Sequence, residues 1–250
     1  MQTPGKGCRA TTALPRAILF DLDDTIISAY RNPHLAWGKV AAEFAAHLGV
    51  HQPAGIAAAI VAHAQEFWGD HARGKHWRMQ LFEARRRIVA TVLSRHDGIA
   101  HLAQPIADRY TSLRDEEMHL HAGAIDTLKA FNERGVRLAL VTNGDGAGQR
   151  KKIERFNLAP YFEHIQIEGE QGFGKPEERT YRHALETLNV APAETWMVGD
   201  NLEWEVAAPQ RLGIHAVWFD GEGAGLPPGA TARPDRIVQA LPELLQDASS

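Results

Sequence analysis

The sequence predicts an α/β fold, a doubly wound parallel sheet with a small all-helical unit inserted after its first strand. Two observations support this prediction. From about residue 122 onward, short apolar runs alternate with amphipathic stretches, which is the order of strand–helix units. Before that, residues 33–118 show apolar residues at helical spacing and no strand-like alternation. Strands that alternate with helices build a mostly parallel sheet covered on both faces.

The elements can be assigned in order along the chain. The first strand is predicted at residues 17–21, and the inserted helices have apolar groups that begin at Trp37, Ile56 and Trp77. Gly135 is expected to end the first helix of the second half. The helices of that half are predicted at 126–134, 150–156, 177–188 and 203–212. Its strands are predicted at 136–141, 165–167, 196–198 and 214–219.

Composition excludes several classes of function. The net charge is −4 with no strongly basic face, so we expect no nucleic-acid partner, and the run 85–87 (Arg-Arg-Arg) is interpreted as a solvated helix face. No apolar stretch approaches the ~20 residues that span a bilayer. Residues 1–16 lack the apolar core of a secretory signal, and residues 1–15 are expected to form a flexible arm. Cys8 is the only cysteine, which excludes an internal disulfide and fits a reducing compartment. We therefore expect a soluble, cytoplasmic protein without a membrane partner. The sequence contains no signal for its oligomeric state.

The most informative segment is Asp21-Leu22-Asp23-Asp24-Thr25, directly after the first strand. Three acids within four positions repel one another, and burying any of them unpaired is costly. A divalent cation such as Mg²⁺ removes this penalty, because it favours carboxylate oxygens. Asp21 and Asp23 point to the same side of an extended chain, so one could attack a substrate while the other handles a proton. The alternative is a cluster that caps a helix N-terminus.

Three further polar segments follow predicted strands: Thr142-Asn143-Gly144, Gly174-Lys175-Pro176, and Gly199-Asp200 with Glu205 one helical turn on. Each alone has an ordinary interpretation as a turn, a surface lysine or a capped helix start. Ligands of parallel sheets, however, bind beyond the carboxyl ends of the strands. A hydroxyl and an amide in a tight turn can hold an anion, a fixed ammonium suits phosphate, and two acids can share a metal shell.

Together, the four segments resemble the motifs of the haloacid dehalogenase superfamily of hydrolases. The resemblance covers nearly the whole chain from about residue 16. It implies a Rossmann-like catalytic core, formed by residues 16–27 and 120–250. It also implies that residues 28–119 form a helical cap at the first insertion site, as in the phosphatase branch of that superfamily.

The resemblance implies a Mg²⁺-dependent phosphatase that hydrolyses a small-molecule phosphate ester through an aspartyl phosphate. Asp21 would be the nucleophile, and Asp23 the general acid and base. The metal would be held by the carboxylates of Asp21 and Asp200 and by the backbone carbonyl of Asp23. Phosphoryl transfer needs little beyond positioning and charge neutralisation, which agrees with these roles.

The remaining motif residues would bind the phosphoryl group or support the site. Thr142, Asn143 and Gly144 would hold phosphoryl oxygens, while Lys175 would neutralise charge on both the nucleophile and the phosphate. Thr25 and Glu205 are assigned supporting roles, Glu205 because many relatives have the shorter aspartate there. The neighbouring Trp204, where a small or polar residue is common, is expected to pack over the site or to anchor its helix.

Three other functions fit the same resemblance. A 2-haloacid dehalogenase shares the attacking aspartate, but that class needs no metal and usually lacks an acid at the position of Asp23. A phosphomutase tends to have glycine where this chain has Asp24. A non-catalytic binding module would be expected to have lost the nucleophile, which is present here as Asp21. These differences favour the phosphatase.

Residues 68–78 join two predicted helices and are expected to form a loop, because Gly69 and Gly74 interrupt the helical pattern. Two interpretations remain open. In the first, the loop lies over the catalytic strand ends, where Arg73 and Arg78 contact the part of the substrate away from phosphorus. In the second, it is a solvated connection whose two tryptophans pack within the cap.

Overall fold

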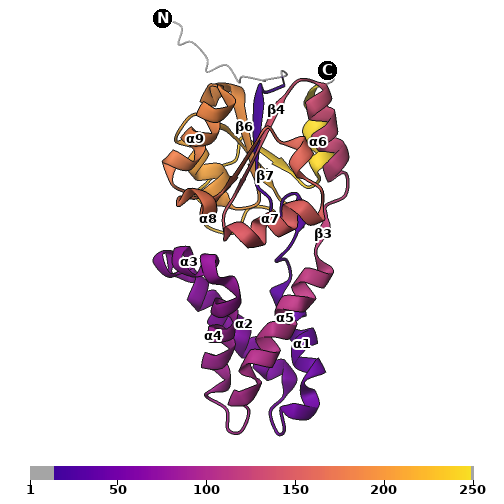
Figure 1. Ribbon diagram of the computed structural model, residues 1–250, viewed down its shortest axis with the longest axis vertical. Coiled ribbons are helices and arrows are strands. Elements are labelled where there is room, and N and C mark those ends of the chain that lie inside the picture. The colour runs from indigo at the N-terminus through magenta and orange to yellow at the C-terminus, as the bar shows by residue number, and fades with distance from the viewer. Residues whose placement is uncertain (1–13, 249–250) are drawn as a thin grey trace, which may run out of the picture.

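The computed structural model describes residues 14–248, which form a sheet domain and a helical cap (Figure 1). The expected N-terminal arm lies outside the described residues except for its last two. Within the described chain, no helix is both long and apolar enough to cross a membrane.

The sheet has six parallel strands in the order β5-β4-β1-β6-β7-β8. Their bounds are β1 (Ala17–Phe20), β4 (Arg137–Thr142), β5 (His164–Ile167), β6 (Thr195–Gly199), β7 (His215–Phe219) and β8 (Arg236–Val238). The central strand β1 is flanked by β4 and β6, with Phe20 in register with Leu140 on one side and Val198 on the other. The carboxyl ends of these three strands therefore meet at one edge of the sheet.

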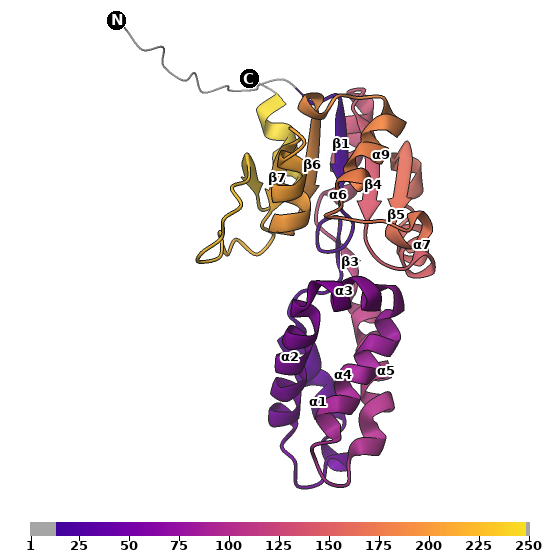
Figure 2. The same ribbon diagram turned by 90° about the vertical axis from the view of Figure 1, so that its left-hand side faces the viewer.

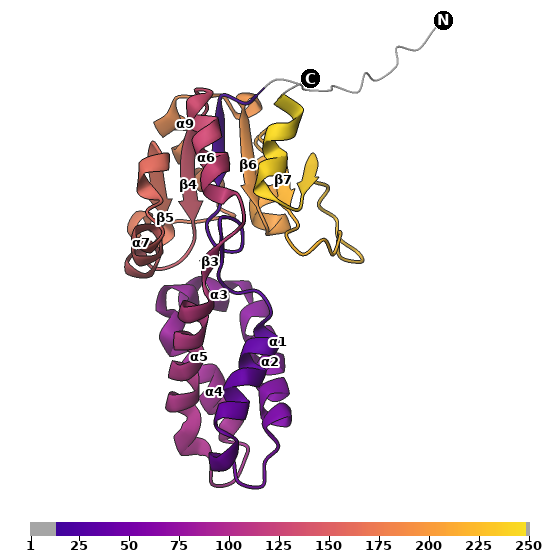
Figure 3. The ribbon, with the colours of Figure 1, turned by 90° about the vertical axis from the view of Figure 1, so that its right-hand side faces the viewer.

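Helices cover both faces of the sheet, as Figures 2 and 3 show from opposite sides. Ile18 and Phe20 face α6 (Ala124–Glu133), α7 (Gly146–Arg155) and the C-terminal 3₁₀ helix Leu241–Ala248. Ala17 and Leu19 face the opposite way, onto α9 (Glu178–Leu188) and α10 (Ala208–Gln210). Because successive residues of a strand point to opposite faces, one short apolar strand fills both layers of the core. The predicted doubly wound α/β fold is confirmed.

The cap is a bundle of helices with its own apolar core (Figure 2). Its helices are α1 (Pro33–Glu43), α2 (Pro53–Gly69), α3 (His71–Trp77), α4 (Leu81–Leu93) and α5 (Ala103–Glu117), with 3₁₀ turns at Ala45–His47, Arg78–Gln80 and Ala100–Leu102. The short helix α3 lies at the end of the bundle nearest the sheet domain. No residue of the sheet is a member of the cap cluster within the described chain.

A small antiparallel ribbon joins the two parts. It consists of β2 (Ile27–Ser28) and β3 (His119–Leu120), in which Ser28 pairs with His119. Beside it, the buried Arg114 of α5 donates hydrogen bonds of 3.1 and 2.6 Å to the carbonyl oxygen of Ala29. The chain therefore leaves the sheet domain and returns to it at one place.

The structure corrects the expectation for residues 68–78, which form helix rather than loop. Gly69 ends α2, and the carboxylate of Asp70 accepts a 2.7 Å hydrogen bond from the backbone N–H of Arg73 at the start of α3. Gly74 lies inside α3, because a helix held by capping and packing tolerates one glycine at a cost of about 1 kcal/mol. The helix predicted at 203–212 is likewise divided, into a π-helical turn Leu202–Ala207 and α10.

Candidate active site

A buried ion pair between Asp21 and Lys175 forms the centre of the site. Asp21 directly follows β1, and the Nζ atom of Lys175 lies 2.5 Å from its Oδ1 atom. The same ammonium lies 2.8 Å from Oε1 of Glu205. Asn143 holds the backbone of Lys175: its Nδ2 donates to the lysine carbonyl at 2.7 Å, and its Oδ1 accepts from the lysine N–H at 2.9 Å. The ammonium is therefore fixed at the end of β1.

Three carboxylates share the charge of Lys175. Burial raises the pKa of Asp21, although Lys175 opposes this effect. Burial, together with the charges of Asp21 and Glu205, raises the pKa of Asp200 to about 9. Burial also raises the pKa of Glu205 to about 7, with Lys175 again opposing. The cluster thus has more acidic groups than one ammonium neutralises, and a further cation would stabilise their charged forms.

A magnesium ion fits this charge deficit. Asp21 and Asp200 follow β1 and β6, which are direct neighbours in the sheet. Within residues 14–248, no three His, Cys, Asp or Glu side chains converge into a metal cage. Mg²⁺ is commonly held by one or two carboxylates, while waters and substrate phosphate oxygens complete its shell. The carboxylates of Asp21 and Asp200 and the backbone carbonyl of Asp23 are the groups that would hold it.

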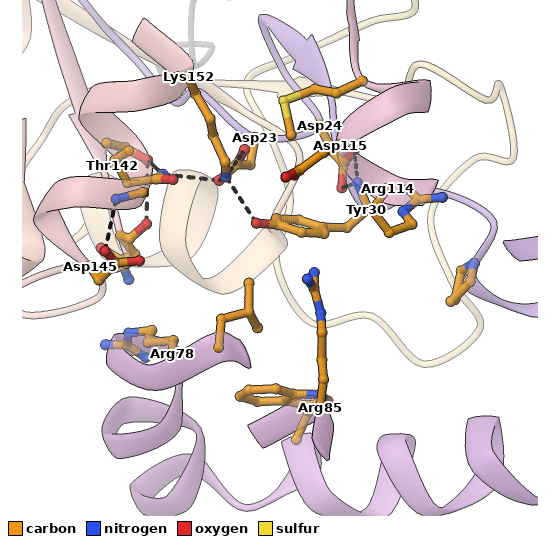
Figure 4. Close-up of a pocket in the computed structure, with 18 of the residues that line it drawn as sticks. Asp23, Asp24, Tyr30, Arg78, Arg85, Arg114, Asp115, Thr142, Asp145 and Lys152 are labelled. Atoms are coloured by element: carbon orange, nitrogen blue, oxygen red, sulfur yellow. Dashed lines mark hydrogen bonds and ion pairs between the residues drawn. The ribbon is translucent and has the colours of Figure 1, made fainter. Parts of the chain in front are cut away.

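Asp23 belongs to a second polar network, which it forms with Lys152 and its neighbours (Figure 4). Both of its carboxylate oxygens lie 2.8 Å from Nζ of Lys152, and Gln149 donates to it at 3.0 Å. The hydroxyl of Tyr30 accepts from the same ammonium at 2.9 Å. Burial lowers the pKa of Lys152, but the charges of Asp23 and Tyr30 and the hydrogen bonds to them together outweigh this effect, so the net shift is upward. Sequence reasoning missed Gln149 and Lys152, although their three-residue spacing places them on one face of α7.

The turn after β4 brings Thr142, Asn143 and Gly144 to the cavity wall. The hydroxyl oxygen of Thr142 accepts a 2.5 Å hydrogen bond from Nε2 of Gln149, which joins it to the Asp23 network. Gly144 has a φ of +120°, and its N–H donates to Oε2 of Glu168 at 3.2 Å. Of the three residues expected to bind phosphate, Asn143 therefore has its side chain committed to Lys175 and Gly144 its N–H committed to Glu168.

Asp24 and Thr25 complete the first motif in different ways. The Asp24 carboxylate accepts hydrogen bonds from the backbone N–H groups of Ala29 (2.8 Å) and Tyr30 (3.0 Å), and its φ of +58° turns the chain toward the cap. The buried hydroxyl of Thr25 donates to Oδ2 of Asp21 at 3.2 Å. Asp24 thus shapes the link to the cap, while Thr25 holds the Asp21 carboxylate.

The segment after β6 supplies both an acid and an aromatic ring. Glu205 is buried and, besides Lys175, accepts a 2.8 Å hydrogen bond from the N–H of Asn201. Its expected support of the metal stays a prediction, since these contacts engage its carboxylate with the protein. The indole of Trp204 lines the cavity, as expected for a side chain that packs over the site, and the guanidinium of Arg78 lies 5.4 Å from its ring centroid.

A cavity of about 630 Å³ opens above these strand ends, between the sheet domain and the cap. Its floor includes Asp21, Asp23 and Asp200, and its roof is formed by side chains of α1, α2, α4 and α5. In Figure 4, Tyr30 lies between the pair of Asp23 and Lys152 and Arg85 of the cap. The size is that of a small-molecule site.

The prediction that residues 85–87 form a solvated helix face is wrong for Arg85. Arg85 is 8% exposed and lines the cavity. Arg86 forms an ion pair of 2.9 Å with Asp108, and Arg87 lies over the ring of Trp77. Successive residues of a helix point about 100° apart, so three adjacent arginines cannot share one face.

The two arginines expected over the strand ends also differ from each other. Arg78 lines the cavity and forms an ion pair with Glu168 of the sheet domain. Arg73 is exposed, 3.7 Å from the carboxylate of Asp70, and its guanidinium lies over the ring of Phe67. Arg78 alone of this pair lies at the cavity wall.

Comparisons with known proteins identify the family of the chain. A family profile described as haloacid dehalogenase-like hydrolase matches residues 15–213. The chain is 37% identical over 161 residues to a phosphoserine phosphatase of Thermus thermophilus, an alignment that spans 64% of this chain and 63% of that protein. It is 31% identical over 211 residues to a ribulose-1,5-bisphosphate 5-phosphatase of Halopiger xanaduensis, spanning 82% and 84%. A glyceraldehyde 3-phosphate phosphatase of Pyrococcus furiosus is 34% identical, and the match spans about half of each chain (50% and 52%).

Solved structures show the same fold. The HAD-hydrolase YfnB from Bacillus subtilis, crystallised with magnesium, superimposes with a TM-score of 0.71 at 22% identity, over 95% of this chain and 100% of that one. A Thermotoga maritima protein assigned as a β-phosphoglucomutase gives a TM-score of 0.65 at 20% identity, over 92% of this chain and 97% of that one. Because a 2-haloacid dehalogenase from Pseudomonas syringae also matches, with a TM-score of 0.59 at 21% identity over 93% and 99%, the fold does not distinguish among these reactions.

Proposed function

The chain belongs to the haloacid dehalogenase-like hydrolases, and on that premise we propose that it is a magnesium-dependent phosphatase of small phosphate monoesters. One observation carries the proposal. The carboxylate of Asp21 lies 2.5 Å from the buried ammonium of Lys175, at the sheet edge beneath the cavity, with a second acid, Asp23, two residues on. This arrangement provides a nucleophile, a fixed positive charge and a proton carrier.

In the first step, a carboxylate oxygen of Asp21 attacks phosphorus. A bond forms between that oxygen and phosphorus, and the bond from phosphorus to the ester oxygen breaks. The leaving oxygen takes a proton from the carboxylic acid of Asp23 and departs as an alcohol. Lys175 stabilises the charge that develops on the phosphoryl oxygens.

In the second step, water attacks the phosphorus of the aspartyl phosphate. Asp23, now a carboxylate, takes the proton of that water. The bond between Asp21 and phosphorus breaks, which restores the carboxylate and releases inorganic phosphate. The net reaction consumes one water and produces one alcohol.

Magnesium, held by Asp21, Asp200 and the carbonyl of Asp23, would neutralise charge between the attacking carboxylate and the phosphoryl group. The raised pKa of Asp200 supports this assignment, because burial and repulsion disfavour its charged form until a cation is present. Lys175 acts beside the metal rather than in place of it, since Glu205 and Asp21 already share its charge.

Two residues weigh against the other reactions of this fold. Asp23 is not needed by a haloacid dehalogenase, yet here it is positioned by Lys152 and Gln149. Asp24 occupies the position where phosphomutases tend to have glycine, and its carboxylate caps two backbone N–H groups. The intact Asp21–Lys175 pair argues against a module that only binds.

The test is phosphate release from a panel of phosphate monoesters with Mg²⁺, repeated after exhaustive EDTA treatment. We expect turnover that EDTA removes and Mg²⁺ restores, and a weakened response to Mg²⁺ in Asp200→Ala. Halide release from 2-haloacids without metal would instead indicate a dehalogenase. Sugar-phosphate isomerisation without phosphate release would indicate a mutase, and binding without turnover would indicate a non-catalytic module.

A further inference from the structure

The cavity above the strand ends continues into the open end of the cap bundle. Four helices contribute to its upper wall, and most of the side chains there are apolar or aromatic. They are Pro33 and Trp37 of α1, Val61, Ala64 and Trp68 of α2, Leu81, Phe82 and Ile88 of α4, and Tyr110 of α5. This volume extends well beyond what a phosphoryl group at Asp21 would fill, so the organic part of a substrate would enter the bundle.

One of the cations in this wall, Arg85, lies against two aromatic rings. Arg85 of α4 is 8% exposed, and its guanidinium carbon lies 5.8 Å from the ring centroid of Tyr30 and 5.4 Å from that of Tyr110. Its Nη1 atom donates a 3.1 Å hydrogen bond to the hydroxyl of Thr111. The ring of Tyr110 is in turn stacked on that of Trp37, with centroids 3.6 Å apart. The guanidinium is therefore held in place by aromatic faces and one neutral hydroxyl.

No carboxylate forms an ion pair with Arg85 anywhere in residues 14–248. The other arginines and lysines of the cavity wall differ in this respect, because each bonds to a carboxylate or carbonyl of this chain or lies exposed. Those with such a bond are Arg78, Arg114, Lys152 and Arg155. The exposed one is Lys151. A buried charge without a counter-ion is costly, and aromatic faces offset only part of that cost. A guanidinium has five N–H donors in a planar fork that matches carboxylate and phosphate oxygens.

The position of Arg85 also determines the path that a ligand must take from the phosphoryl position into the cap. The ring of Tyr30 faces Arg85, and its hydroxyl lies 2.9 Å from Nζ of Lys152, which holds Asp23. Arg85 and Asp23 are therefore linked through the side chains of Tyr30 and Lys152 (Figure 4). A ligand that reaches from the phosphoryl position to Arg85 must pass this ring, so an organic chain joins its two charged ends.

We propose that the substrate carries a second anionic group, a carboxylate or a second phosphate, which enters the cap bundle and binds to Arg85. This inference rests on the phosphatase function proposed above and specifies the substrate class of that site. Arg85 acts on selectivity, because it contacts the end of the substrate remote from phosphorus, and remote binding energy makes a good substrate react faster than a truncated one.

The experiment compares ω-carboxyalkyl phosphates of graded chain length with their terminal amides, which match them in shape but carry no second charge. Alkane bisphosphates of the same lengths distinguish a phosphate from a carboxylate. The variants are Arg85→Gln and, as a matched control, Arg86→Gln, since Arg86 is adjacent, exposed and paired with Asp108 outside the cavity. The quantity measured is the ratio of kcat/KM for the charged ester over that for the amide.

We expect wild type and Arg86→Gln to prefer a charged ester at one chain length, and Arg85→Gln to lower that ratio by roughly 10- to 100-fold, the worth of one charge-assisted hydrogen-bonded contact. The larger fall, with carboxylate or with bisphosphate, identifies the natural anion. A wild type without charge preference at any length overturns the inference. So does an Arg85→Gln variant that folds as wild type and loses activity toward charged and neutral esters equally.

The phosphatase proposal can fail separately. If wild type hydrolyses none of these esters, nor a simple aryl phosphate with Mg²⁺, that proposal is wrong. Calorimetric titration with the non-hydrolysable ω-carboxyalkyl phosphonates and their amides then decides the inference. Tighter binding of the acid, lost in Arg85→Gln and kept in Arg86→Gln, supports it, and equal binding overturns it.

Discussion

Arg78 of the cap and Glu168 of the sheet domain form a two-pronged ion pair, with both hydrogen bonds 2.5 Å long. Their side chains are 14% and 4% exposed, so the pair is largely removed from water. The same Glu168 carboxylate accepts from the N–H of Gly144, in the turn that follows β4. One carboxylate therefore connects the cap with the loop beneath which phosphate would bind.

Arg78→Ala is expected to lower kcat/KM for every phosphate ester by a similar factor, roughly 10- to 100-fold. The reason is that Glu168 loses its cation while remaining buried, which disfavours the closed arrangement of cap and sheet domain. Steady-state kinetics on a large and a minimal ester measure this. The control is Lys75→Ala, which removes an exposed pair with Glu177 (2.7 Å) worth about 0–1 kcal/mol. A change in substrate ranking rather than a parallel loss would contradict the closure role.

Asp21→Asn should abolish phosphate release and leave the thermal midpoint nearly unchanged. An amide cannot form the acyl phosphate, whereas Lys175 keeps Glu205 as its partner at 2.8 Å. Removal of one charge also reduces repulsion on Asp200. Turnover assays and thermal unfolding are measured side by side, with the exposed Asp126→Asn as control for loss of a charge. Substantial activity in freshly purified Asp21→Asn protein would show that another group attacks phosphorus.

Lys152→Met is expected to lower kcat by roughly 10- to 100-fold, with a much smaller change in KM. Lys152 contacts both carboxylate oxygens of Asp23 and the hydroxyl of Tyr30, so we expect it to position the proposed proton carrier rather than the phosphate. Steady-state kinetics separate the two parameters, and Lys129→Met, an exposed change on α6, is the control. A rise in KM at constant kcat would mean that Lys152 binds substrate instead.

We expect protonation of His121 to destabilise the folded protein in acid. Burial lowers its pKa to about 4, and the charges of Arg31 and His119 act in the same direction. Its folded form binds a proton less tightly than its unfolded form, so its contribution to stability is complete above pH ~6.5 and falls as the pH drops toward 4. Urea unfolding of His121→Gln should therefore show a shallower decline over this range than wild type. The exposed His101→Gln should decline as wild type does, and equal slopes for all three proteins would refute the assignment.

Sequence reasoning located the elements and the strand ends because both depend on local patterns. Long apolar runs identify central strands, and the parallel order brings their carboxyl ends together without further information. The strands β2 and β3 have two residues each, and β8 is only half buried with three. Such short pieces carry no periodicity that can be measured.

It was harder to predict which helical side chains face the cavity, because this depends on how each helix is rotated about its axis. Arg85 was grouped with its neighbours in the chain, yet it precedes Ile88, Val89 and Val92 at the spacing of one buried stripe. That spacing was the available signal, and the arginine run obscured it. Lys152 had a similar signal in its spacing to Gln149, but its partner Asp23 is 129 residues away, and only the fold brings them together.

The antiparallel pair of Ser28 and His119 has an evolutionary consequence. Residues 33–117 form one insertion in the sheet domain, and its two ends lie close together. The loop-closure entropy of such an insertion grows only with the logarithm of its length. The insertion can therefore become longer or shorter, or be replaced, during evolution without a change in the strand order that places the catalytic residues. Substrate selectivity can then diverge while the reaction is conserved.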